Sequence, residues 1–379
     1  MKEGTANHAV YRDQYTPYPW NLKTASIRFD IEEKCTRVAS TLEFEPVFTG
    51  GAEDIVLNGE HMELVSLRRN GKALEEGDFS LTDSLLTVHG NSGPCRLDTE
   101  VLIRPQENTA LEGLYPSGDF LLTQCEAEGF RKITYFPDRP DVMTRYDVTI
   151  VADRERYPVL LSNGNAVDSG EMDDGRHWVR WVDPFAKPSY LFALVAGDLA
   201  CVEDRFTTRS GRQVDLRIYV EHENLDKCGH AMESLIRSMK WDENRFGLEY
   251  DLDIYNIVAT NDFNMGAMEN KSLNIFNSKY VLASPETATD TDYQGIESVI
   301  GHEYFHNWTG NRVTCQDWFQ LTLKEGLTVF RDQEFSSDMQ SRAVKRIQDV
   351  RVLRARQFPE DSGPMAHPIK ATRVALSAY

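Results

Sequence analysis

The stretch ESVIGHEYFHNW, Glu297 to Trp308, places two histidines and a glutamate within five positions. On an α-helix, residues four apart lie near one face, about 6 Å apart along the axis. His302 and His306 can therefore direct their imidazoles at one shared ion. Glu303 lies at the edge of that face, where it can reach a water beside the ion without binding the ion itself. The pattern H-E-x-x-H predicts a helical metal site with a carboxylate base. A pair of surface histidines is the alternative.

A third metal ligand is expected from a separate element, because one helix cannot surround an ion. The segment WFQLTLKEGLTVFRDQEF, Trp318 to Phe335, is a second predicted helix, and Glu325 lies on it. Eighteen residues separate His306 from Glu325, enough for a turn that brings one helix alongside the other. A catalytic zinc has three protein ligands and one open position. His302, His306 and Glu325 are thus predicted to hold one Zn2+ per chain. Taken alone, Glu325 would more often be a solvated helix residue.

The composition excludes several kinds of protein. Of the 379 residues, 41 are Lys or Arg and 60 are Asp or Glu, so the net charge is −19. This acidity disfavours nucleic acid and anionic membranes as partners. The longest apolar run, Tyr190 to Gly197, is far shorter than the ~20 residues that span a bilayer. The polar start MKEGTANHAVYRDQ lacks the apolar core of a signal peptide. The six cysteines form no C-x-x-C pair. We therefore expect a cytoplasmic, monomeric protein.

The hydrophobic period changes along the chain. From Thr24 to about Val220 apolar residues alternate, as in SIRFDI, where Ile27, Phe29 and Ile31 share one face. Asn-Gly turns separate such runs, which favours an antiparallel sheet. Further on, helical spacing predicts helices at residues 224–246, 293–309, 319–336 and 338–357, with strands at 252–259 and 272–283. The sequence thus predicts a β domain over residues 1–198 and a mixed α and β domain over residues 199–379.

The zinc motif and its surroundings resemble a known family. H-E-x-x-H with a glutamate eighteen residues further on is similar to the glutamate-zincin (gluzincin) metallopeptidases. The flanking HNWTGN (306–311) and LTLKEGLTVF (321–330) resemble the aminopeptidase N branch, in its bacterial form. The resemblance implies a saddle-like N-terminal antiparallel β-sheet domain followed by a thermolysin-like α+β catalytic domain. It covers only the N-terminal part of a typical member, so the catalytic domain is expected to be incomplete at its C-terminus.

The segment NMGAMEN, residues 264–270, resembles the exopeptidase signature of that branch. There, G-A-M-E-N forms an edge strand whose backbone pairs with the substrate and whose glutamate binds the free amine. The substrate-binding residues carried over are Gly266, Ala267, Met268, Glu269 and Asn270. Gly266 has no side chain to block a close backbone approach, and an edge strand can take an extended peptide by β-addition. Without the zinc motif, this segment would more often be a turn.

A second amine anchor is expected from the β domain. TQCEAEGF, residues 123–130, resembles the family's other amine-binding segment and carries over Glu126 and Gln124, although Ala127 stands where animal members have proline. Met265 and Tyr280 resemble residues that line the first side-chain pocket in bacterial members, and core filling is the alternative for Met265. Four glutamates facing one zinc ion, with no further cation, would make the cleft strongly acidic. A protonated α-amine would relieve that imbalance.

Together these features imply a zinc-dependent aminopeptidase that removes the N-terminal residue from peptides with a free N-terminus, with Glu303 as general base. Three alternatives stay open: a gluzincin endopeptidase, an epoxide hydrolase-like enzyme and a catalytically silent peptide-binding fragment. The last follows from the family's oxyanion tyrosine, which would fall a few residues beyond Tyr379, the last residue of the sequence. Tyr379 itself lies too early to be assigned that role.

Overall fold

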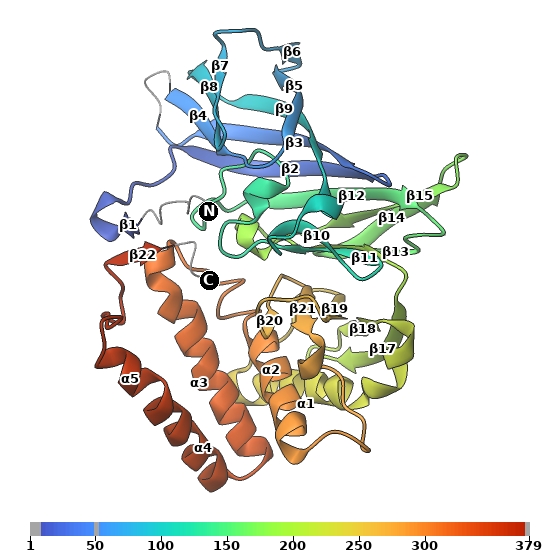
Figure 1. The fold of residues 1–379 in the computed structure, drawn as a ribbon, viewed down its shortest axis with the longest axis vertical. Coiled ribbons are helices and arrows are strands. Elements are labelled where there is room, and N and C mark those ends of the chain that lie inside the picture. The colour runs from blue at the N-terminus through green and yellow to red at the C-terminus, as the bar shows by residue number, and fades with distance from the viewer. Residues whose placement is uncertain (1–8, 49–52, 376–379) are drawn as a thin grey trace, which may run out of the picture.

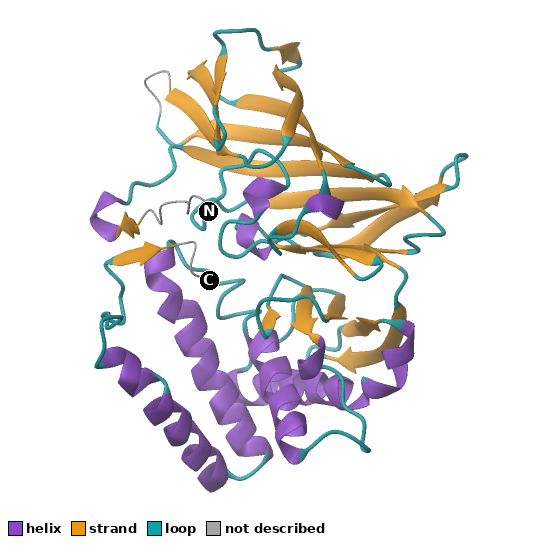
Figure 2. Ribbon diagram, viewed as in Figure 1, coloured by secondary structure: helices purple, strands orange, loops and turns teal. Residues whose placement is uncertain are grey.

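The computed structural model describes residues 9–48 and 53–375, and Tyr379 lies outside these ranges. Strands dominate the first part of the chain and helices the second (Figure 1, Figure 2). β16 (Leu194–Gly197) still pairs within a sheet of the first part, whereas β17 (Ala200–Thr207) starts the sheet of the second. We propose the domain boundary between these two strands, near residue 198, where the hydrophobic period also changes.

The largest sheet of the first domain has eight strands and carries the alternating pattern. Ile27, Phe29 and Ile31 of β2 are buried on one face, as predicted. One pairing differs from the antiparallel prediction, because β12 runs parallel to β2. The two strands are far apart in the sequence, so no hairpin fixes their relative direction. In sheet order the strands are β14 (Asn165–Glu171), β15 (Arg176–Val182), β12 (Arg145–Asp153), β2 (Trp20–Ile31), β3 (Thr36–Pro46), β9 (Cys95–Ile103), β5 (Glu63–Arg69) and β6 (Lys72–Ala73).

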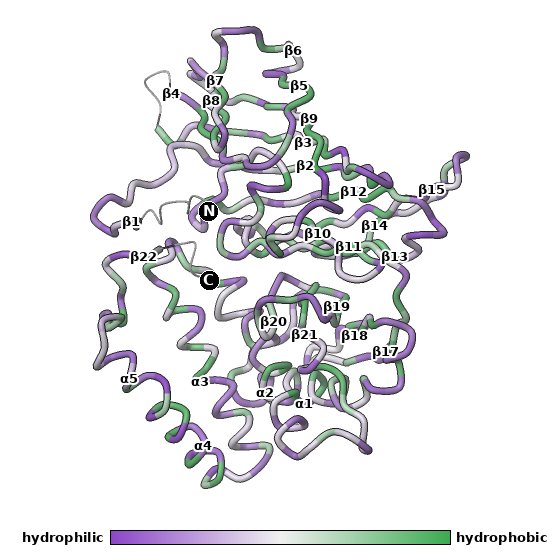
Figure 3. The backbone as a smooth tube through the Cα atoms, viewed as in Figure 1, coloured by the Kyte–Doolittle hydropathy of each residue, from purple (hydrophilic) through white to green (hydrophobic). Residues whose placement is uncertain are grey.

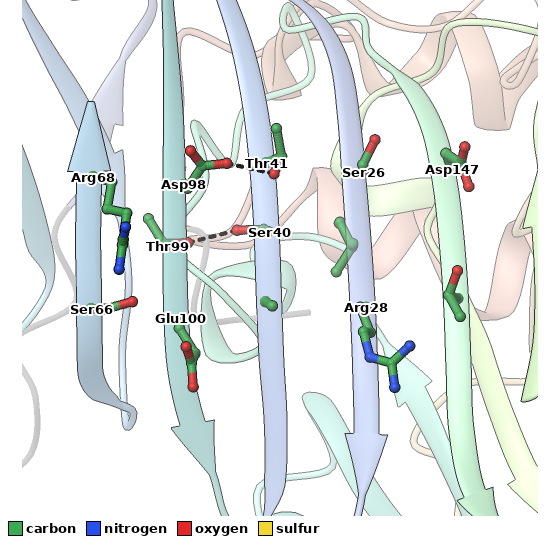
Figure 4. A pocket seen from close by; sticks show the side chains of 13 residues that line it. Ser26, Arg28, Ser40, Thr41, Ser66, Arg68, Asp98, Thr99, Glu100 and Asp147 are labelled. Atoms are coloured by element: carbon green, nitrogen blue, oxygen red, sulfur yellow. Dashed lines mark hydrogen bonds between the residues drawn. The ribbon is translucent and has the colours of Figure 1, made fainter. Parts of the chain in front are cut away.

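The opposite face of this sheet is polar. Ser26 and Arg28 of β2 lie between Thr41 of β3 and Asp147 of β12, around the hollow that Figure 4 shows. Thr41 donates a hydrogen bond to Asp98 of β9 at 2.7 Å. A sheet with one polar and one buried face produces the period of two that the sequence displays.

Smaller sheets complete the first domain and reach the second. The four-stranded sheet contains β10 (Gly113–Ser117), β11 (Phe120–Gln124), β16 and β13 (Val159–Ser162), and the three-stranded sheet contains β4 (Glu53–Asn58), β8 (Leu85–Asn91) and β7 (Phe79–Leu81). β1 (Ala9–Tyr11) pairs with β22 (Arg373–Ala375), so both ends of the described chain lie side by side (Figure 1). Ser117 hydrogen-bonds Thr260 of the second domain at 2.7 Å. The hairpin of β10 and β11 therefore lies at the domain junction.

The second domain is mixed α and β, as predicted, and packs helices against a five-stranded sheet. Its sheet order is β17, β18 (Gln213–Val220), β19 (Ile254–Thr260), β21 (Leu273–Asn277) and β20 (Ala267–Met268). The helices are α1 (Gly229–Phe246), α2 (Asp290–Phe305), α3 (Leu321–Met339), α4 (Arg342–Ala355) and α5 (Gln357–Asp361). α2 begins at a capping box in which Thr289 and Asp292 satisfy each other's backbone N–H groups. Each long predicted helix is present, with ends shifted by a few residues.

Two predicted elements in this domain have the wrong extent. The strand predicted at residues 272–283 ends at Asn277, whose side chain accepts a hydrogen bond from the backbone of Lys279 and starts a 3-10 turn over Ser278–Tyr280. The helix predicted from residue 224 begins with a 3-10 segment, His222–Lys227, before α1. In both places a 3-10 turn replaces part of the predicted element.

The hydrophobic core continues across the domain boundary. Leu122 and Val195 of the first domain share one cluster with Ile275 and Trp318 of the second. A second cluster lies between the five-stranded sheet and α1, α2 and α3. Apolar segments gather along these inner strands and helices in Figure 3, whereas α4 has no buried residue. Within the described ranges, no helix combines the length and hydropathy that crossing a membrane requires.

Candidate metal centre

Three side chains from two helices converge at the end of α2. His302 Nε2 and His306 Nε2 lie 3.0 Å apart, and Glu325 Oε2 of α3 lies 3.5 and 3.6 Å from them. Ligand atoms that share one zinc ion at bonds of about 2.0–2.2 Å are roughly 3.3–3.5 Å apart. Two histidine nitrogens at this separation, both facing a carboxylate, fit a cation between them. The predicted trio is therefore brought together, and its donor atoms suit Zn2+.

The other nitrogen of each imidazole is held by an acceptor. His302 Nδ1 donates to Asp332 Oδ2 at 2.7 Å, and His306 Nδ1 donates to the carbonyl of Thr309 at 2.9 Å. Acceptors at Nδ1 place the proton there and leave Nε2 free to bind a metal. The sequence analysis did not single out Asp332. It follows Glu325 by seven residues, two turns along α3, and that spacing is the signal that could have identified it.

Glu303 lies close to both His306 and Glu269, and one ligand atom of each of these three residues lies within 4.8 Å of the others. The Glu303 side chain is buried, and Oε2 has no hydrogen-bond partner among the described residues. Burial raises the pKa of Glu303 well above its ordinary value, and Glu269 and Glu325 add to the effect, while His302 opposes it. A buried carboxylate with an unpartnered oxygen and a raised pKa is a strong proton acceptor, which suits a general base.

The two predicted amine anchors meet at a lysine that the sequence analysis overlooked. Glu126 follows β11, Glu269 follows β20, and both reach Lys324 Nζ on α3. The Nζ to Glu126 Oε1 distance is 3.0 Å, and Nζ lies 2.7 Å from Oε1 of the ligand Glu325. The condition of no further cation, on which the predicted strong acidity depended, is therefore not met, because Lys324 pairs with three of the four glutamates. Because Lys324 directly precedes Glu325, the sequence alone could have included its positive charge in the charge balance of the site. Only the fold shows that it turns toward the two anchors.

Lys324 and the histidines set the charge states of the two anchors. Burial raises the pKa of Glu126 to about 7, although Lys324 opposes the shift. Burial also acts to raise the pKa of Glu269, but His306 and Lys324 outweigh it, and the pKa is lowered. The pKa of Lys324 is raised despite its burial, because Glu126 and Glu269 stabilise its charge. At neutral pH Glu269 is thus ionised, and Glu126 is near the midpoint of its titration.

The G-A-M-E-N segment forms the edge of the five-stranded sheet, as the resemblance implied. β20 pairs only with β21 among the described strands, and the Gly266 carbonyl accepts from Asn277 N at 2.9 Å. A Cβ at Gly266 would lie 3.1 Å from the Tyr280 ring, so glycine permits this packing. The side chains of Met268 and Asn270 are buried and Ala267 is half-buried. These three residues therefore offer mainly backbone groups.

The remaining predicted residues lie near the G-A-M-E-N segment. Gln124 Nε2 lies 3.6 Å from Met265 Sδ and donates to the Glu126 carbonyl at 3.1 Å, while Gln124 Oε1 is buried without a partner within the described chain. Met265 is 36% exposed, which excludes core filling for it. Tyr280 lies at the end of the 3-10 turn that follows β21, and its ring is positioned beside Gly266. Sequence-distant segments from both domains therefore meet near β20.

A thermolysin-like α+β domain with an H-E-x-x-H helix, a glutamate on the next helix and a β-sheet domain in front of it defines a class, the gluzincin-type metallopeptidases. Comparisons with known proteins identify the family within this class. The Peptidase M1 N-terminal domain matches residues 18–191, and the Peptidase family M1 domain matches residues 230–377. The chain belongs to peptidase family M1.

Named relatives agree with this assignment. The chain is 58% identical to aminopeptidase N of Escherichia coli over 373 residues, 97% of this chain and 42% of that protein. It is 57% identical to aminopeptidase N of Caulobacter vibrioides over 363 residues, 96% of this chain and again 42% of the relative. Among solved structures, Legionella pneumophila aminopeptidase A in complex with aspartic acid matches with a TM-score of 0.84 at 38% identity, over 87% of this chain and 39% of that one. The chain thus spans about 42% of the length of the curated relatives.

Proposed function

We propose that the protein is a zinc aminopeptidase that hydrolyses the first peptide bond of substrates with a free N-terminus. The observation that carries this proposal is the convergence of Glu126 and Glu269, from different domains, beside the His302, His306 and Glu325 donor set. The names of the relatives, aminopeptidase N, point to the same activity.

The proposed selectivity is electrostatic. The four glutamates, set against Lys324 and a divalent ion, leave about one negative charge in the cleft when all are ionised. One oxygen of Glu126 and one of Glu269 pair with Lys324, and the other oxygens make no hydrogen bond within the described residues. These free oxygens are suited to bind an α-ammonium, which supplies the missing positive charge. An internal peptide segment brings no such charge.

The proposed mechanism assigns one role to each group. Zinc, when bound by His302, His306 and Glu325, would act as a Lewis acid on the scissile carbonyl and lower the pKa of a water. Glu303 takes the proton from the attacking water and passes it to the leaving amine. Glu126 and Glu269 hold the ammonium, and the β20 edge aligns the substrate backbone, so the first peptide bond lies over the centre. Met265 and Tyr280 then face the first side chain.

The test compares an amino-acyl anilide and a short peptide, each with a free and with an acetylated N-terminus. Loss of a buried charge pair costs about 2 kcal/mol or more, so acetylation should lower kcat/KM by about 30-fold or more. A chelator should abolish turnover of the free substrate, and added Zn2+ should restore it. Equal cleavage of both forms would favour an endopeptidase. Zinc bound at one per chain without turnover would favour a peptide-binding module.

A further inference from the structure

The segment Thr309–Thr314, here named the bridging loop, follows α2 and folds back over His306. The carbonyl of Thr309 accepts from His306 Nδ1 at 2.9 Å, and the backbone N–H of Asn311 donates to the carbonyl of His306 at 2.9 Å. The loop is closed by Gly310 N, which donates to the carbonyl of Val313 at 3.0 Å. The orientation of the His306 ring therefore depends on where this loop is held.

A glycine allows the loop to come this close to the imidazole. Gly310 has a φ of +144°, and a Cβ there would lie 2.8 Å from His306 Nδ1. Any side chain at this position would push the loop away from the ring. The same loop also reaches the amine-binding segment, because Asn311 Nδ2 donates to the carbonyl of Glu269 at 2.8 Å. One short loop thus contacts both a metal ligand and an amine anchor.

The first domain holds this loop through one buried tyrosine. Tyr190 lies in the 3-10 helix Ser189–Leu191, and its hydroxyl donates to the Gly310 carbonyl at 3.1 Å. The Thr314 hydroxyl completes the arrangement at 2.7 Å from the Tyr190 oxygen. The ring is packed edge-on against Trp318, with centroids 5.1 Å apart. Burial raises the pKa of Tyr190 well above its ordinary value, so the hydroxyl keeps the proton that it donates.

We propose that Tyr190 is a positioning residue through which the β domain orients the metal ligand His306. Its hydroxyl fixes the Gly310 peptide, the bridging loop fixes the Thr309 carbonyl, and that carbonyl fixes the imidazole. The affinity of the catalytic domain for zinc then depends on a hydroxyl group from the other domain. This inference rests on the proposed metal site and adds a metal-orienting role to the β domain, beyond its contribution of Glu126.

The test is Tyr190→Phe, which keeps the ring against Trp318 and removes only the hydroxyl. The zinc dissociation constant, measured by competition with a chromophoric chelator, should rise about 10-fold, at the lower end of the effect of losing a residue that orients a metal ligand. The visible spectrum of the Co2+-substituted protein should shift as the ligand geometry relaxes. Tyr146→Phe is the matched control, because Tyr146 is equally buried in the same domain and its hydroxyl has no partner within the described residues.

The outcomes separate this inference from the proposed function. If wild-type protein binds zinc tightly and Tyr190→Phe has the same dissociation constant and Co2+ spectrum as Tyr146→Phe, the positioning role is overturned while the metal site stands. If wild-type protein binds no zinc, the proposed function fails first. Thr314→Val gives a second route should Tyr190→Phe not fold. It leaves Tyr190 in place but removes the hydroxyl beside it, so zinc binding should weaken by a smaller factor, and unchanged binding would count against the proposal.

Discussion

At the scale of single residues, most side chains of the candidate site are hydrogen-bonded or ion-paired through one polar atom, which leaves a second polar atom available to a metal or a substrate. Asp332 and the Thr309 carbonyl accept hydrogen bonds from Nδ1 of His302 and His306, so both Nε2 atoms are left free and lie 3.0 Å apart. Lys324 pairs with one oxygen of each proposed amine anchor, Glu126 and Glu269, and the other oxygen of each is available to a ligand. Glu303 is the exception, since its Oε2 is buried with no partner within the described residues. That atom is the one that the proposed reaction uses.

The roles of Glu303 and His302 predict opposite effects of substitution. Glu303→Gln keeps the size of the side chain and all three donor atoms, so zinc should stay bound at one per chain while turnover falls by about 10²–10⁴-fold. His302→Ala removes a donor and should lose the metal itself. Metal analysis after gel filtration, together with anilide turnover, measures both. Release of zinc by the Gln variant would make Glu303 a ligand and reverse the assignment.

The raised pKa of Glu126 predicts pH-dependent substrate binding. Its pKa is about 7 because of burial, and only the ionised form attracts an ammonium. The affinity for a free amine should therefore rise with pH through about 7, and fall once the α-amine deprotonates near ~8. In Glu126→Gln the rise of 1/KM around neutral pH should disappear, whereas the pH profile of kcat should persist, because it depends on Glu303. If the KM profile were unchanged in that variant, Glu126 would not be an amine anchor.

The raised pKa of Glu126 also makes the stability of the fold depend on pH. The folded-state pKa of Glu126 lies above the ordinary 4.5, so folding favours its protonated form. The favourable contribution of Glu126 to the free energy of unfolding is fully present below about pH 4.5 and is lost as the pH rises through about 7.

At the scale of secondary structure, the spacing between α2 and α3 sets the distance between the histidines and Glu325. The helices meet where Gly301 faces Phe335 of α3 and Ser238 of α1. A Cβ at Gly301 would lie 2.9 Å from Phe335 Cδ1 and 3.3 Å from Ser238 Oγ. Gly301 directly precedes His302, so any displacement there moves a proposed metal ligand.

Gly301→Ala should therefore destabilise the fold despite the better helix propensity of alanine. Overpacking costs about 1–3 kcal/mol, against a gain of about 1 kcal/mol from removing a helical glycine. Gly295→Ala, on the same helix, is the matched control, because its Cβ would meet only Tyr280 at an ordinary 3.8 Å. Urea unfolding should rank Gly301→Ala below Gly295→Ala by about 1–3 kcal/mol. Equal free energies of unfolding for the two variants would show that α2 and α3 can move apart at Gly301 without loss of stability.

At the scale of the whole molecule, the two domains are joined by both apolar and polar contacts. Leu122 and Trp318 belong to one core cluster. Asn163 donates to the Lys271 carbonyl, and Gly164 N donates to the Ser272 hydroxyl, each at 2.7 Å. Since the proposed amine site takes Glu126 from one domain and Glu269 from the other, the relative placement of the domains is part of that proposed site.

A shared core predicts that the domains unfold together. Every long helix of the described chain lies in the second domain, so helical ellipticity follows that domain, and fluorescence of a variant retaining only Trp20 and Trp181 follows the first. The two probes should give coincident urea transitions. Leu122→Ala, a truncation in the first domain worth about 2–5 kcal/mol, should shift both midpoints equally. A helical signal that outlasts the tryptophan change would show that the domains are energetically separate.

Much of the fold could be predicted because its signals are local. The period of two over β2 and the 3.6-residue period over α1, α2 and α3 follow from which side chains must be buried. Element ends were less predictable: the turn at Asn277 and the 3-10 segment before α1 are decided by hydrogen bonds that hydrophobic spacing does not register. The parallel pairing of β12 with β2 depends on a long connection rather than on either strand.

The sequence by itself was enough to predict the candidate metal ligands, since helical geometry places His302 and His306 on one face, and Glu325 lies at a characteristic distance from a recognisable motif. The resemblance to the aminopeptidase N branch also identified Glu126 and Glu269 as candidate amine-binding residues. Only the tertiary structure decided how these groups are controlled: Lys324 between the anchors, Asp332 behind His302, and Tyr190 holding the loop around His306. The physical reason is that a ligand set on neighbouring helical turns is a local property, whereas the charge and orientation of each member depend on groups that are brought close only when two domains pack together.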